Sequence, residues 1–346
     1  MKRRRIVLLA VLLWLVSAIP VAGQGGVDQP DLAIALPGRG DLVIAPFPDT
    51  VWVLNRAQPM AAPTQAGMLY RLDLNTQLVD VVEVRGAPQA MVAAAGALWI
   101  TSNPPGAGNR PMPVLLRFDP AGDAPDALDL SAAIDSGIGE IAYGAGSLWL
   151  TPLGGSPHLL RLDPASRRVI ADIDFGGGAA AALGARLYPL AADDAAVWVV
   201  DETRQLIMQV DPAANAVVAE YGLPEGGRVI PLMRDFAAGL GALWYPYAAS
   251  ASARALLVID AAGRAIADSI APREGLSFIS NLQAYGGYLW LGANTVIYRI
   301  DPLTRTFEAV LHPSNSGYIA LSESGLWTVQ GARAPAPTLA RFPLPG

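Results

Sequence analysis

Residues 147–164 read SLWLTPLGGSPHLLRLDP, and this stretch decides the fold. It holds two landmarks, a Leu-Trp pair at Trp149 and an Arg-Leu-Asp-Pro run that begins at Arg161. Both landmarks recur in phase along the chain, with tryptophans 37 to 50 residues apart. The seven repeats centre on Trp52, Trp99, Trp149, Trp198, Trp244, Trp290 and Trp327. Two landmarks that stay in phase over seven copies predict a repeat architecture.

Each repeat contains four short apolar runs, as residues 137–175 illustrate. The runs are Glu140 to Ala145, Leu148 to Thr151, Leu159 to Leu162 and Val169 to Ile173. Gly, Pro and Asp separate them, and helical periodicity is nearly absent, which favours strands. Four strands per 40–50 residues is typical of a propeller blade. The sequence therefore predicts an all-β fold, a seven-bladed β-propeller of four-stranded blades.

The seventh repeat contains only three predicted strands before the sequence ends at Gly346. An unpaired outer edge would be a liability for aggregation. The segment from Asp31 to Pro37 precedes the first repeat, and its apolar residues alternate with polar or small ones. We expect this segment to pair with Thr338 to Leu344 and to complete the last blade. Residues 24–346 would then form one propeller domain.

The first 23 residues have the pattern of a signal peptide. Lys2 to Arg5 is a basic start, Ile6 to Ile19 is an apolar run, and Val21 and Gly23 occupy the −3 and −1 positions of a cleavage site. We expect the mature chain to begin at Gln24 and to be secreted, periplasmic or on the cell surface. The alternative is an uncleaved N-terminal anchor.

Composition bounds the partners and the chemistry. Apolar residues make up 52% of the chain and charged residues 16%, enough for a large core. Without residues 1–23 the chain holds 20 basic and 30 acidic residues, a net charge of about −10. That charge disfavours nucleic acid and anionic membranes as partners. The absence of cysteine excludes disulfides and thiolate chemistry. We expect a monomer whose partner is a small polar ligand, a protein or a peptide.

The repeated landmarks have structural interpretations. An Asp followed by Pro favours a type I turn in which the carboxylate accepts bonds from backbone N–H groups two residues on. We expect this role for Asp119, Asp163, Asp211 and Asp301, with calcium ligation as the alternative. A tryptophan in every blade is expected to pack between blades.

The pattern Leu-Trp-apolar-Thr followed by Leu-x-Arg-apolar-Asp-Pro resembles the streptogramin B lyase-like propellers, and also the YVTN-type and NHL-type repeat propellers. The resemblance covers about residues 31–346. In the lyase branch it implies an active-site His, an active-site Glu and a magnesium ion. Here Gln89 stands where that His is expected, and among the residues three after each Trp only Asp201 is acidic. The resemblance therefore implies the fold and does not carry the activity.

The polar residues nine or ten positions before each Trp are the candidates for a site. They begin the innermost strands, which converge where the channel of a propeller opens. The predicted ligand-binding residues are Glu140, Arg234, Asp235, Asn281 and Tyr318, with Asp201, Glu202 and Arg204 on a rim loop of the fourth repeat. The alternative is a mouth that is merely solvated. His158 and His312 fall in different repeat phases, so we expect neither to be catalytic.

These observations favour an exported binding or interaction module with an unknown ligand. One alternative is a metal-assisted lyase or lactonase-type enzyme at the channel mouth, which three converging carboxylates would support. The other is a structural component of the cell surface, which a channel filled by apolar side chains would support.

Overall fold

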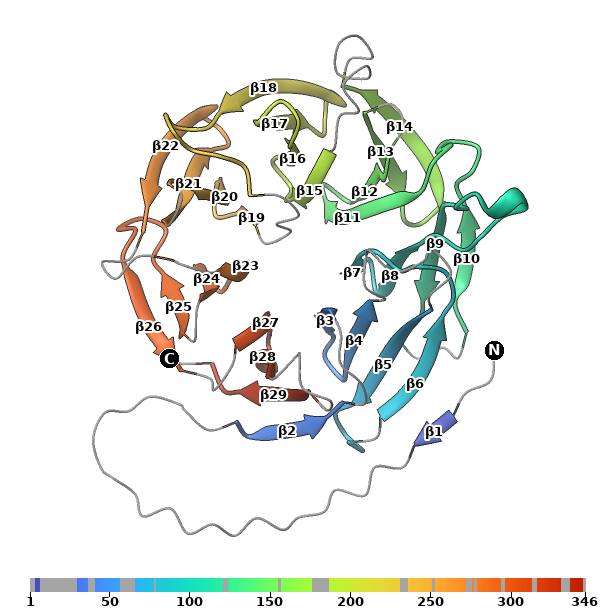
Figure 1. The fold of residues 1–346 in the computed structure, drawn as a ribbon. Helices are drawn as coiled ribbons and strands as arrows, with labels where there is room; N and C mark the ends of the chain where they lie inside the picture. The colour runs from blue at the N-terminus through green and yellow to red at the C-terminus, as the bar shows by residue number, and fades with distance from the viewer. Residues whose placement is uncertain are drawn as a thin grey trace, which may run out of the picture.

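The computed structural model describes residues 4–6, 30–36, 41–56, 66–77, 79–120, 124–154, 157–175, 187–230, 236–250, 253–271, 276, 279–293, 296–312, 316–330 and 337–344. Seven antiparallel sheets stand in a ring around a central axis (Figure 1). Each sheet is one blade, and its strands run in order from the centre to the outside. The predicted seven-bladed propeller is therefore confirmed.

The blades have the following bounds. Blade 1 contains β3 (Asp41–Pro46), β4 (Thr50–Arg56), β5 (Gly67–Asp73) and β6 (Val79–Val84); blade 2 contains β7 (Met91–Ala94), β8 (Ala97–Ser102), β9 (Val114–Phe118) and β10 (Asp126–Asp129). Blade 3 contains β11 (Ile138–Gly144), β12 (Ser147–Pro152), β13 (His158–Asp163) and β14 (Arg168–Asp174); blade 4 contains β15 (Leu187–Ala192), β16 (Val197–Asp201), β17 (Leu206–Asp211) and β18 (Ala216–Gly222). Blade 5 contains β19 (Ala237–Gly239), β20 (Ala242–Ala248), β21 (Arg254–Asp260) and β22 (Ala265–Ile270); blade 6 contains β23 (Ile279–Tyr285), β24 (Tyr288–Ala293), β25 (Val296–Ile300) and β26 (Phe307–Leu311). Blade 7 contains β27 (Ser316–Ser322), β28 (Gly325–Gln330), β29 (Thr338–Phe342) and β2 (Leu32–Ala35), and a 3₁₀ turn (Ala107–Asn109) lies in blade 2.

The N-terminal strand closes the ring. β2 pairs antiparallel with β29, with Leu32 opposite Arg341 and Ala35 opposite Thr338 (Figure 1). Asp31 extends the pairing, because its N–H donates to the carbonyl of Arg341 at 3.0 Å and its carboxylate accepts from Arg341 Nε at 2.9 Å. The inner strand of blade 7 in turn lies against that of blade 1. The predicted closure is confirmed.

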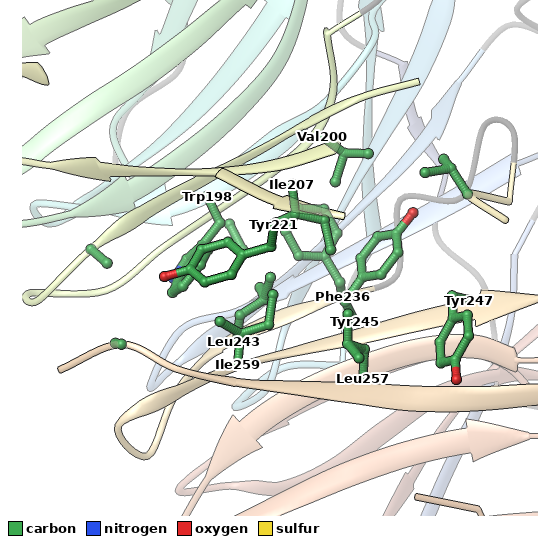
Figure 2. Packing of buried hydrophobic residues seen from close by; sticks show 14 of the residues in the cluster. Trp198, Val200, Ile207, Tyr221, Phe236, Leu243, Tyr245, Tyr247, Leu257 and Ile259 are labelled. Atoms are coloured by element: carbon green, nitrogen blue, oxygen red, sulfur yellow. The ribbon is translucent and has the colours of Figure 1, made fainter. Parts of the chain in front are cut away.

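The core is divided into seven hydrophobic clusters, one between each pair of neighbouring blades. Each cluster contains one repeat tryptophan, and every one of these tryptophans is at most 3% exposed. Figure 2 shows the cluster between blades 4 and 5, where Trp198 and Tyr221 meet Leu243 and Ile259. The rings of Trp198 and Tyr221 lie 6.0 Å apart. The predicted inter-blade role of the tryptophans is thus confirmed.

The two landmarks face each other across each blade. Trp149 lies opposite Arg161 on neighbouring strands, and the same pairing joins Trp52 to Arg71. In four blades the guanidinium lies over the indole ring, with separations of 5.0 to 5.9 Å. In blade 4 the arginine is replaced by Gln209. Cross-strand stacking explains why the landmarks keep their spacing.

The hairpin between the first two strands determines what each indole N–H does. In blade 3 the connection is Ala145-Gly146, both at positive φ, as a two-residue type I′ turn requires. This turn lets Trp149 Nε1 donate to the carbonyl of Gly144, five residues earlier, at 3.0 Å. The connection has the same length in blades 1 and 4, since Phe47 N and Asp193 N donate to the carbonyls of Thr50 and Ala196, but its residues have no positive φ. The indole N–H groups of Trp52 and Trp198 there have no hydrogen-bond partner.

The Asp-Pro steps form the predicted turns. The carboxylates of Asp163, Asp211 and Asp301 accept the backbone N–H two residues on, at 3.0, 2.7 and 2.7 Å. The structural interpretation of these three residues is therefore confirmed. The turn that follows Asp119 runs into residues 121–123, outside the described part.

The predicted signal segment, residues 1–23, lies outside the described residues apart from β1 (Arg4–Ile6), which pairs with β6. Within the described ranges, no helix is long and apolar enough to span a membrane.

Candidate ligand site at the mouth of the ring

The mouth is the rim where the inner strands begin and the second strands end. At this rim four inner strands carry one extra residue relative to their partners. The register shifts lie between Ile138 and Ile141, Tyr188 and Leu190, Ile279 and Asn281, and Ser316 and Ile319. Such β-bulges kink the strand and re-aim side chains, and they are frequent next to functional sites.

The bulge of blade 3 carries Glu140. Gly139 and Glu140 fall together opposite Thr151, and the N–H of Glu140 donates to Thr151 Oγ1 at 3.3 Å. The side chain of Glu140 lies on β11, and the residue is only 8% exposed. Burying a carboxylate is costly unless the surroundings compensate its charge. Its position at the bulge therefore constrains the carboxylate of Glu140.

The bulges of blades 6 and 7 bring two further predicted residues onto neighbouring strands. Asn281 donates from Nδ2 to the carbonyl of Ile319, so its amide ties β23 to β27. Tyr318 precedes Ile319, is partly buried and packs against the cluster between blades 7 and 1. Glu140 lies on the opposite side of the ring (Figure 1).

The rim residues of blade 4 hold a turn. Asp201 is fully buried at the end of β16, and its carboxylate accepts from Arg204 N at 2.9 Å and from Arg204 Nε at 2.6 Å. Arg204 also lies 3.6 Å from Glu220. The Asp201–Arg204 pair is thus bonded within its own loop. Burial, followed by the charge of nearby Glu202, raises the pKa of Tyr245 in blade 5.

Arg234 and Asp235, the remaining predicted residues, lie outside the described residues. The assignment of all eight residues to a ligand site stays a prediction.

Sequence reasoning missed a set of buried polar residues at the ends of the second strands. Arg56 donates to the carbonyl of Gln89 at 2.8 Å, and Thr101 donates to that of Gly139 at 2.7 Å. Asn103 binds both the N–H and the carbonyl of Ile138, at 2.7 and 2.8 Å. Each bond runs from one blade to the first residues of the next, so these side chains fix the rim. Polar residues near the ends of these mostly apolar second strands were the available signal in the sequence.

His158 has one described partner. Its Nδ1 lies 2.8 Å from the carboxylate of Asp172, on the two outer strands of blade 3. No three His, Cys, Asp or Glu side chains are grouped to hold a metal ion in the part of the chain that the structure describes.

No protein-family model matches the chain, and no curated protein sequence matches it either. Solved structures do match. The WD40 domain of Neurospora crassa Pan2 has a TM-score of 0.59 at 7% identity over 90% of each chain. The β-propeller domain of Myceliophteria thermophila Cps50 (Swd1) has a TM-score of 0.57 at 9% identity, over 92% of this chain and 100% of that one. BamB from Moraxella catarrhalis has a TM-score of 0.53 at 12% identity, over 91% of this chain and 99% of that one.

At these identities the likeness concerns the fold alone. The neighbours support a propeller family, while the resemblance to the streptogramin B lyase-like branch is not confirmed.

Proposed function

We propose that this chain is an exported, monomeric propeller that acts as a binding module and takes its ligand at the mouth of the ring. The observation that carries the proposal is the recurrence of a bulge at the same level of four inner strands. Bulges that redirect side chains are frequent next to functional sites.

The chemistry of the re-aimed residues indicates a small polar ligand or a polar peptide. Glu140 supplies a carboxylate, Asn281 an amide and Tyr318 a phenol. Arg234 and Asp235, at the equivalent level of blade 5 in the sequence, would add a charge of each sign. A few polar groups on a rigid scaffold are typical of small-ligand sites. The acidic net charge makes nucleic acid an unsuitable partner.

The enzymatic alternative needs a general base at the mouth. Glu140 or Asp235 would have to serve. The structural alternative is favoured at two positions, since Asn281 ties blade 6 to blade 7 and Thr101 of blade 2 donates to the carbonyl of Gly139 at the bulge of blade 3.

A thermal-shift screen of small polar compounds and divalent cations on the mature protein tests the proposal, because a ligand raises the melting temperature. For any hit, the double variant Glu140→Gln, Asp235→Asn should lose most of the shift. Glu83→Gln, on the exposed outer strand of blade 1, is the matched control and should keep it. A hit whose shift survives in the double variant would place the site elsewhere.

Export has a separate test. N-terminal sequencing of protein recovered outside the cytoplasm should begin at Gln24. Recovery of a cytosolic protein with Met1 intact would overturn export and leave the ligand site unaffected.

A further inference from the structure

In the described part of blade 1, the buried polar atoms Thr50 Oγ1, Trp52 Nε1 and Arg71 Nε have no hydrogen-bond partner. Thr50 is 6% exposed and Trp52 is 1% exposed. A buried polar group without a hydrogen-bond partner is costly, so folded proteins rarely leave several together. This concentration in one place calls for an explanation.

The three residues lie next to one another on one face of blade 1. Thr50 and Trp52 are two residues apart on β4, so their side chains point to the same face of the blade. Arg71 lies directly opposite Trp52 on β5, with its guanidinium carbon 5.5 Å from the ring centroid. Trp52 belongs to the cluster between blades 1 and 2, and its ring lies 5.9 Å from that of Phe118. The three residues are therefore at the interface of these two blades.

Blade 3 shows how the same positions are satisfied within the protein. Its counterparts of Thr50 and Arg71 are Ser147 and Arg161, and Arg161 Nε donates to Ser147 Oγ at 2.9 Å. Trp149 donates to the carbonyl of Gly144 across the two-residue turn. Blade 1 has a turn of the same length, closed by Phe47 and Thr50, but without the positive-φ residues of blade 3, and neither bond is formed.

Arg71 differs from its counterparts in one more respect. Arg117, Arg299 and Arg341 each pair with an acid, namely Asp126, Glu308 and Asp31. Over the described residues, Arg71 has no such ion pair, although its charge adds to the effect of the Thr76 N–H in lowering the pKa of Asp73.

We propose that Thr50, Trp52 and Arg71 hold one small hydrogen-bond acceptor, a water molecule or a halide ion, between blades 1 and 2. An indole N–H and a guanidinium N–H can only donate, so the occupant must accept two bonds. The hydroxyl of Thr50 can donate a third bond to a halide or accept one from water. Buried waters make about three such bonds. The bound water or halide then takes the place of the two hydrogen bonds that Trp149 and Arg161 donate within blade 3.

Crystals soaked in sodium bromide test the site directly. The expected result is density for a single atom at hydrogen-bonding distance from the three donors. An anomalous signal identifies a halide, and density without that signal identifies water. An empty site, or an Arg71 side chain bonded to Thr50 as its counterpart is in blade 3, overturns the proposal.

A second test measures melting temperatures in solution and uses variants at the matching positions of other blades as its control. Thr50→Val and Trp52→Phe each remove one bond to the same occupant, so the double variant should lower the melting temperature by less than the sum of the single variants. Ser147→Ala in blade 3 and Trp244→Phe in blade 5 remove hydrogen bonds that share no partner, so their effects should add. Additive losses in blade 1 as well would overturn the shared occupant.

Discussion

The guanidinium carbon of Arg161 lies 5.0 Å from the centroid of the Trp149 ring, with the two residues directly opposite on β13 and β12. The same guanidinium donates to the carbonyl of Pro212 at 2.5 Å and to Asn215 Oδ1 at 2.9 Å. Pro212 and Asn215 belong to the outer turn of blade 4. One side chain therefore covers the tryptophan of its own blade and joins that blade to the next.

Replacing Arg161 by Met should destabilise the ring at this junction. Stacking of a cation on an indole contributes about 0.5–1 kcal/mol, and each lost hydrogen bond about 1 kcal/mol more, so we expect a loss of roughly 2–3 kcal/mol. Urea unfolding measures it. Arg117→Met is the control, since Arg117 stacks at 5.9 Å and lies 3.9 Å from its acid partner. Equal losses in the two variants would contradict the junction role.

The indole N–H groups predict a second difference between blades. Trp99 donates to the carbonyl of Ala94 at 3.1 Å, whereas Trp198 has no hydrogen-bond partner. Both side chains are at most 1% exposed, so the loss of indole volume in a Trp→Phe variant should lower the stability by a similar amount in each. Trp99→Phe should therefore cost about 1–3 kcal/mol more than Trp198→Phe, because it leaves a buried carbonyl unpaired. Chemical denaturation of the two variants gives the comparison, and a larger loss for Trp198→Phe would refute it.

The turn aspartates predict how stability depends on pH. Hydrogen bonds from Ser166 and the N–H of Ala165 lower the pKa of Asp163, and the N–H groups of Thr304 and Leu303 lower the pKa of Asp301. A folded-state pKa below the unfolded value means that this stabilisation is present above about pH 4 and is lost as the pH falls further. Melting temperatures should therefore drop below pH 4.

The double variant Asp163→Asn, Asp301→Asn isolates this effect, since the amide oxygen keeps an acceptor in each turn without a titrating group. Its melting temperature should fall less steeply than that of the wild type between pH 4 and pH 2. Parallel acid profiles for the two proteins would show that other carboxylates control the decline.

The repeat made the fold predictable, because Trp149 and Arg161 are required by packing and recur at fixed spacing in the sequence. Side-chain directions at the mouth were not predictable. Glu140 and Asn281 lie at bulges, where one extra residue breaks the alternation of faces that sequence patterns assume. Arg56 was missed for another reason: its bond to the carbonyl of Gln89 depends on the neighbouring blade, and no local pattern records that contact.

Closure of the ring gives the last prediction. Leu36 is 1% exposed, and Leu32 and Ile34 pack against the cluster between blades 7 and 1, so the N-terminal strand carries part of the core. Removing residues 24–38 from the mature chain exposes the edge of β29 and withdraws these side chains. Partial burial of three such residues is worth about 4–6 kcal/mol, which corresponds to a fall of roughly 10–20 °C in melting temperature. Removing residues 24–29 alone leaves β2 and the Asp31–Arg341 ion pair in place and should change little. Differential scanning calorimetry distinguishes the two, and an unchanged melting temperature in the longer deletion would show that β2 does not hold the ring closed.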